Sequence, residues 1–143
     1  MFLSQKAVIK MLPQKEPFRF LDVVEYFERD KKKLVASQIF NSNAFFFKGH
    51  FPNNPIVPGV LLTETIAQAG LLLISLLERK SIKVGYLAQI EKAKFFREIL
   101  PNEPLKIKCL LKKKIGDYYY ITGEIYSQKI EKRCMKATVI VCV

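Results

Sequence analysis

PGVLLTETIAQAGLLLISLLE, residues 58–78, is the stretch that decides the fold of this 143-residue chain. Its uncharged run from Thr65 to Leu77 is shorter than the roughly 20 apolar residues that a membrane-spanning helix needs. Pro58 suits the first turn of a helix, because its fixed φ fits helical backbone and its missing N–H is not needed there. A helix that is apolar nearly all round must be enclosed by other elements. We therefore expect one long central helix and no membrane span.

The segments on both sides of this helix predict a short helix and several strands. Residues 4–12 favour a helix, with Ser4 as its N-cap and Pro13 as its stop. In residues 101–114 apolar residues alternate with lysines, which is the period of a half-buried strand. Two strands are expected in residues 18–30 and 33–40, and three or four antiparallel strands in residues 86–96, 101–114, 118–127 and 134–143.

This order of elements predicts an α+β fold. A single curved antiparallel sheet wrapped around the one long helix would enclose its apolar surface, whereas βαβ repeats are absent from the pattern. The chain shows no internal repeat, low-complexity tract or linker. Its length suits one domain, so we expect a single domain over residues 1–143.

The charge of the chain indicates which kinds of partner it can attract. The formal net charge is +11, from 24 Lys and Arg against 13 Asp and Glu. Such a balance attracts nucleic acid, acidic lipid surfaces or a strongly acidic protein. No helix-turn-helix, zinc-finger or RNP signature supports a nucleic-acid partner. Residues 1–17 lack the apolar core of a signal peptide, so a soluble, cytoplasmic protein is expected.

The cysteines do not predict a metal site. Cys109, Cys134 and Cys142 lie far apart without a CxxC pair, and the chain has one histidine. We interpret them as small strand residues in a reducing cytosol.

The only histidine, His50, lies in a loop with prolines at positions 52, 55 and 58. Each proline fixes φ and restricts the residue before it, so we expect a stiff, extended loop that holds His50 in one place. Histidine is the side chain best suited to transfer a proton near neutral pH. The alternative is a histidine with structural hydrogen bonds only, but the rigid setting favours a catalytic base.

Two further groups stand at the start of the long helix. The free N–H of Gly59 could hold a carbonyl oxygen that becomes negative, although Pro-Gly is also an ordinary helix start. Glu64 lies in an apolar helix with Gln68 four residues later on the same face. Burial would raise its pKa and let it act as a general acid, unless it simply reaches solvent.

A base, a carbonyl-polarising N–H and an acid within 15 residues suit one class of chemistry. The set predicts proton removal next to a carbonyl, followed by loss of a β-hydroxyl as water. The sequence contains no GxSxG elbow, P-loop or GxGxxG.

Residues 49–70, GHFPNNPIVPGVLLTETIAQAG, resemble the signature GHFPxxPxxPGVLxxExxAQ of the FabZ-type 3-hydroxyacyl-acyl carrier protein dehydratases. MLPQKEPFRFLDVV is similar to their LPxRxPFLLxD segment, and IEKAKFFREILPNEPLKIK to KxRFRxPVxPGD. The resemblance spans most of the chain at the expected spacings. It implies a hot-dog fold, which is an antiparallel sheet wrapped around one helix.

The resemblance also implies a mechanism without a cofactor or metal. His50 would remove the α-proton while a carbonyl near Ile56 holds its other ring nitrogen. Gly59 N–H would polarise the thioester carbonyl, and Glu64, oriented by Gln68, would protonate the departing hydroxyl of a (3R)-3-hydroxyacyl thioester. The implied substrate-binding residues are Ile56, Pro58, Gly59 and Gln68. The product would be a trans-2-enoyl thioester of fatty acid or related lipid synthesis.

The implied partners are a second copy of the chain and an acidic acyl carrier protein. Family members work as dimers, often three dimers to a hexamer, with His50 of one subunit facing Glu64 of the other. The family segment that contacts the carrier protein is matched here by Lys92, Lys94 and Arg97. The alternative interpretation is that these three residues only form a solvated strand edge. Attraction of an acidic carrier protein would be a function for the positive net charge of the chain.

Departures from the family pattern leave alternatives open. Asn53 replaces a usual glycine, and residues 14–16 and 96–98 depart from the flanking patterns. Glutamate at position 64, where the dehydratase-isomerases have aspartate, argues against isomerisation. The competing hypotheses are a hot-dog thioesterase, in which the same acid activates water, and a non-catalytic protein that binds acyl carrier protein.

Overall fold

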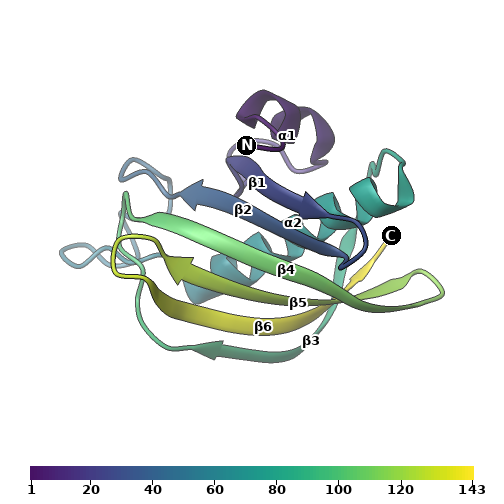
Figure 1. The fold of residues 1–143 in the computed structure, drawn as a ribbon. Helices are drawn as coiled ribbons and strands as arrows, with labels where there is room; N and C mark the ends of the chain where they lie inside the picture. Colours follow the sequence, from purple (N-terminus) through teal and green to yellow (C-terminus); the bar gives the residue numbers. More distant parts are fainter.

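In the computed structural model, which describes residues 1–143, one antiparallel sheet wraps around a single long helix (Figure 1). The sheet order is β1-β2-β4-β5-β6-β3, so the strand that follows the long helix lies at one edge. The predicted α+β class and the hot-dog arrangement are confirmed. The elements are α1 (Gln5–Met11), β1 (Val23–Glu28), β2 (Lys33–Ile39), α2 (Gly59–Glu78), β3 (Tyr86–Phe95), β4 (Pro104–Ile115), β5 (Tyr118–Ser127) and β6 (Lys132–Cys142).

Two predicted boundaries differ from the structure, each for a local reason. Pro58 is the N-cap of α2 rather than a first-turn residue, because its ψ of 133° leaves it in extended backbone. The first strand begins at Val23 rather than near Phe18. The backbone of residues 18–20 bonds to the side chain of Gln68, which replaces the partner that a strand would offer.

Helix α2 forms the centre of the core. Its buried hydrophobic residues belong to one cluster of 31 buried hydrophobic side chains, to which α1 and every strand except β3 also contribute. The helix approaches β5 so closely that a Cβ on Gly123 would lie 2.4 Å from Cγ2 of Ile66. By length and composition α2 could cross a membrane, but 72% of its most apolar window is buried inside the protein. It is therefore the core helix of a soluble fold.

The three cysteines lie in strands, as predicted, with Cys109 in β4 and the other two in β6. Cys109 and Cys134 are buried, whereas Cys142 is partly exposed. Burial raises the pKa of the Cys109 thiol to about 12, which makes it an unreactive core residue.

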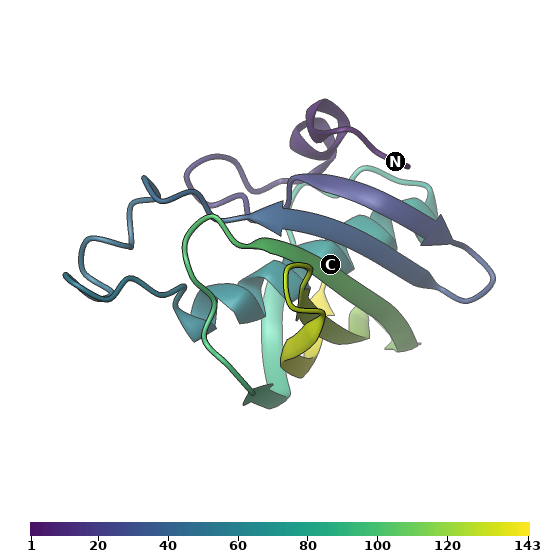
Figure 2. The same ribbon diagram turned by 60° about the vertical axis from the view of Figure 1, so that its left-hand side comes forward.

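Two parts of the chain stand out from the packed body. All residues of edge strand β3 are exposed, although Leu87, Ile90 and Phe95 are apolar. The connection between β2 and α2, which carries His50, extends beyond the end of the sheet (Figure 2). Both features lie around the start of α2.

Candidate active site

The loop before α2 is held by backbone hydrogen bonds as well as by its prolines. The N–H of Phe51 donates to the carbonyl of Asn54 at 3.1 Å, and the N–H of Asn54 donates to the carbonyl of Phe51 at 3.0 Å. Ile56 N–H donates to the His50 carbonyl at 2.9 Å. The expected extended loop is therefore wrong for this part, because a tight turn brings Ile56 back beside His50.

This turn places the imidazole of His50 against two neighbours. Its Nδ1 lies 3.0 Å from the Ile56 carbonyl oxygen, which is the contact that the resemblance implied. A carbonyl can only accept, so Nδ1 carries the proton and Nε2 keeps a free lone pair. The ring also stacks on Phe51, with centroids 4.4 Å apart and an interplanar angle of 23°. Nε2 is thus the atom that can take a proton.

The start of α2 offers two free donors. Leu61 N–H and Leu62 N–H both donate to the Pro58 carbonyl, at 3.0 and 3.3 Å. The N–H groups of Gly59 and Val60 have no acceptor in the chain. Together with the positive end of the helix dipole, these groups can hold a partly negative oxygen.

One turn further along α2, Glu64 is held by a buried amide. Nε2 of Gln68 donates to the Glu64 carboxylate at 3.0 Å and to the Phe18 carbonyl at 2.8 Å, while Oε1 accepts from Phe20 N–H at 2.7 Å. Burial raises the pKa of Glu64, and the hydrogen bond from Gln68 opposes part of that rise. A partly buried carboxyl with a raised pKa can act as a general acid.

The structure separates the three residues that we expected to contact a carrier protein. Lys92 and Lys94 line a hollow of about 230 Å³ together with Arg133 and Lys136 of β6. Arg97 instead pairs with the buried carboxylate of Glu103 at 2.7 Å, and this partner raises the pKa of the arginine. Sequence reasoning missed Arg133 and Lys136 because the pairing of β3 with β6 is a long-range contact.

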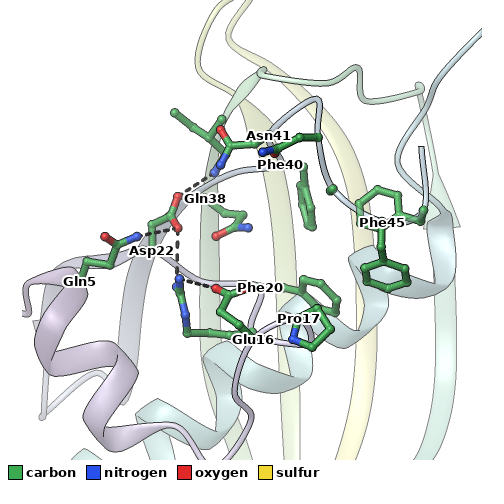
Figure 3. A pocket seen from close by; sticks show the side chains of 14 residues that line it. Gln5, Glu16, Pro17, Phe20, Asp22, Gln38, Phe40, Asn41 and Phe45 are labelled. Atoms are coloured by element: carbon green, nitrogen blue, oxygen red, sulfur yellow. Dashed lines mark hydrogen bonds and ion pairs between the residues drawn. The ribbon is translucent and has the colours of Figure 1, made fainter. Parts of the chain in front are cut away.

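A larger hollow, of about 380 Å³, lies elsewhere and holds none of the predicted site residues (Figure 3). Its charged groups contact one another, since Arg19 bonds to Glu16 at 2.6 Å and lies 3.6 Å from Asp22, which leaves one negative charge in excess. The Asp22 carboxylate also accepts from Ile39 N–H at 3.0 Å. These contacts join the segment before β1 to the end of β2, and they explain the hollow as part of the scaffold.

At two positions this chain has asparagine where the family pattern has glycine, and the two asparagines differ in backbone conformation. Asn53 does not adopt a left-handed conformation, so the turn around it needs no glycine. Asn102, which takes the place of the glycine in the family pattern KxRFRxPVxPGD, has a φ of 64°. Its N–H donates to the Phe40 carbonyl at 2.7 Å and its side chain accepts from Ser42 N–H at 3.0 Å. Asparagine tolerates this conformation better than most residues.

The fold is shared with several solved structures. The dehydratase heterocomplex ApeI:P from Xenorhabdus doucetiae has a TM-score of 0.78, covers 94% of this chain and 89% of that chain, and is 15% identical. A hypothetical thioesterase with coenzyme A from Streptococcus pneumoniae TIGR4 has a TM-score of 0.64, with coverage of 84% and 83% and 15% identity. At such identities the likeness establishes the fold alone, which is the hot-dog fold.

The sequence also matches a family model and related proteins over most of the chain. The model of the FabA-like domain matches residues 12–131. The 3-hydroxyacyl-acyl-carrier-protein dehydratase FabZ of Clostridium tetani is 40% identical over 106 residues, which are 74% of each chain. FabZ of Ruminiclostridium cellulolyticum is 38% identical over 115 residues, which are 80% of each chain. The chain therefore belongs to the FabA-like family, among its FabZ-type dehydratases.

The raised pKa of Glu64 predicts a pH-dependent stability difference. Because the folded state binds the carboxyl proton more tightly than the unfolded state, ionisation of Glu64 opposes folding. This penalty is absent below about pH 4 and grows as the pH rises through the raised pKa. Glu64→Gln should therefore gain free energy of unfolding relative to wild type between about pH 4 and pH 7, as measured by urea denaturation.

The exposed Glu91→Gln on β3 is the control for removal of one negative charge. If the difference in free energy of unfolding between Glu64→Gln and wild type stays constant across this pH range, the raised pKa of Glu64 is contradicted.

Proposed function

We propose that this protein removes water from (3R)-3-hydroxyacyl-acyl carrier protein to form the trans-2-enoyl thioester, in fatty acid or related lipid synthesis. The family supports this activity, since the relatives carry it in their names. The observation that carries the proposal is the presence in one motif of a histidine with one ring nitrogen held and a carboxyl group with a raised pKa. His50 has its Nδ1 occupied by Ile56, and Glu64 has a raised pKa.

In the first half of the reaction His50 acts as the base. Its Nε2 takes the proton from the α-carbon, and the electrons of the C–H bond move toward the thioester carbonyl. The carbonyl oxygen gains negative charge, which the free N–H of Gly59 stabilises. Ile56 keeps the ring in the required tautomer and stabilises the imidazolium that forms.

In the second half Glu64 acts as the acid. The electrons return to form the C2–C3 double bond as the C3–O bond breaks, and Glu64 gives its proton to the departing hydroxyl. Water leaves, and the site then holds an imidazolium and a carboxylate. Transfer of a proton from His50 to Glu64, directly or through solvent, restores both groups. Gln68 holds the carboxylate in place throughout.

A product assay tests this function against its two competitors. Wild-type protein incubated with 3-hydroxyacyl carrier protein should yield a thioester lighter by one water, detected by mass spectrometry. His50→Ala and Glu64→Gln should each lower the rate by at least about 100-fold, because each removes one proton-transfer group. Free hydroxy acid would instead identify a thioesterase, and unchanged bound substrate a non-catalytic module. Full activity in His50→Ala would contradict the mechanism.

We further propose that two copies of the chain form each active site. Edge strand β3 has no partner on its outer side, and its backbone groups remain free to pair with another strand. Val60, which follows the glycine that Phe95 of this strand contacts, is 76% exposed although it is apolar. In the loop that carries His50, the apolar Phe51 is half exposed. A two-fold axis beside β3 would cover these residues and bring the protruding His50 loop of each subunit toward the partner's Glu64.

Mixing two inactive variants tests the shared site. If His50 and Glu64 come from different subunits, a mixed dimer of His50→Ala and Glu64→Gln chains contains one intact site. Co-refolding equal amounts should then restore about a quarter of wild-type activity, since half of the dimers are mixed and each has one of two sites. No recovery, with mixed dimers proven by mass spectrometry, would place both residues of a site in one chain. Sedimentation of the wild type separates dimer from hexamer.

The carrier protein is proposed to dock on the outer face of the sheet. Lys94 lies directly opposite Lys136 in the β3–β6 pair, and like charges in this arrangement destabilise a sheet. An acidic partner would remove that repulsion. Arg97 contributes indirectly, by holding the segment after β3 through Glu103. The free cysteines suit the reducing cytoplasm in which we place the protein.

Charge reversal at Lys92 and Lys94 tests this docking. Lys92→Glu/Lys94→Glu should raise KM for the carrier-linked substrate roughly 10-fold at low salt, because electrostatic steering is lost. The KM for a pantetheine-linked substrate, which lacks the carrier, should stay unchanged. The double variant Lys6→Glu/Lys10→Glu on α1 controls for net charge. Equal effects of both double variants would contradict a localised docking site.

A further inference from the structure

Phe95, a residue of edge strand β3, packs against the first residue of α2. A Cβ on Gly59 would lie 3.0 Å from Cε1 and 3.1 Å from Cζ of the Phe95 ring. Such distances are shorter than ordinary contacts, so the ring occupies the space that any other residue at position 59 would need. Gly59 is therefore explained by a contact inside the chain, and not only by the approach of a substrate.

Strand β3 directs its side chains to opposite faces of the sheet. Lys92, Lys94 and Phe96 all line the outer hollow that also contains Lys136. Phe95, between them in the alternation, lies on the inner face against α2. Phe95 is 50% exposed and Phe96 is 48% exposed. The two side chains therefore differ in the face of the sheet on which they lie, and not in their exposure.

The half-exposed Phe95 ring packs on the residue that carries the first free donor of the helix start. Gly59 N–H and Val60 N–H have no acceptor in the chain, and the ring occupies the side-chain position of Gly59. With a substrate in place, an apolar ring here would limit the directions from which an oxygen can reach the donor and would help to keep water away from it. A donor shielded from water stabilises a developing negative charge more strongly than one in open solvent.

We propose that Phe95 is a positioning residue for the thioester carbonyl, acting through Gly59 N–H. This inference rests on the proposed dehydration. The ring forms the wall against which the thioester lies, so that the carbonyl oxygen meets the helix start and the α-carbon stays in reach of the base. Phe95 would contribute to the rate of the chemical step more than to the binding of the carrier-linked substrate, whose charged contacts lie on the other face.

The kinetic test compares Phe95→Ala with Phe2→Ala on carrier-linked substrate, because Phe2 is similarly exposed and lies outside every proposed site. Phe95→Ala should lower kcat by roughly 10-fold to 100-fold with little change in KM, because a misplaced carbonyl reacts slowly. Phe95→Leu, which keeps an apolar wall, should recover most of this loss. Phe2→Ala should keep the wild-type kcat. Circular dichroism and thermal unfolding of each variant exclude loss of folded protein as the cause.

A double-mutant cycle on stability tests the contact without relying on activity. Gly59→Ala should destabilise the wild-type background, because its Cβ meets the ring, and should cost less in the Phe95→Ala background. Equal costs in both backgrounds would overturn the packing on which the inference rests. Equal kcat values for Phe95→Ala and Phe2→Ala, with an active wild type, would overturn the positioning role alone. An inactive wild type would overturn the proposed function itself.

Discussion

The site depends on the three hydrogen bonds of Gln68, a fully buried amide in an otherwise apolar helix. A buried amide without partners costs free energy, so its donors and acceptor must be satisfied inside the core. The backbone of Phe18 and Phe20 supplies two partners, and Glu64 supplies the third. The same amide therefore fixes the segment before β1 and the acid of the site.

The proposed base, His50, is held by an equally local arrangement. Ile56 donates its N–H to the His50 backbone and accepts from the His50 ring through its carbonyl. Both bonds require the tight turn from Phe51 to Asn54 between them. The tautomer of the imidazole is thus set by the backbone of its own loop, and it does not need a neighbouring carboxylate. This leaves Glu64 free for its separate, proposed role as an acid.

Strand β3 contacts the proposed active site on one face and is open to possible partners on its other face and along its free edge. Its inner side chain Phe95 reaches the helix start, its outer lysines face a basic hollow, and its free edge offers a place for a second copy. An exposed edge with apolar side chains is a liability that proteins normally cover or charge. Dimerisation, carrier docking and positioning of the thioester are therefore proposed for different sides of one strand.

The sequence by itself determined the long apolar helix, the α+β class and the motif that carries His50 and Glu64. These features depend on residues close together in the chain, where helix periodicity and proline chemistry act directly. The partner of Gln68 within the helix was also predictable, because residues four apart share a helix face. Its other partners were not, since Phe18 and Phe20 lie far away in the sequence.

Only the tertiary structure decided which residues meet across the sheet. It brought Lys136 opposite Lys94 and placed Phe95 rather than Phe96 on Gly59. A one-residue change of register would send every side chain of β3 to the other face, and the sequence pattern of this exposed strand does not specify that register. The pairing of β3 with β6, which closes over α2, is what specifies it.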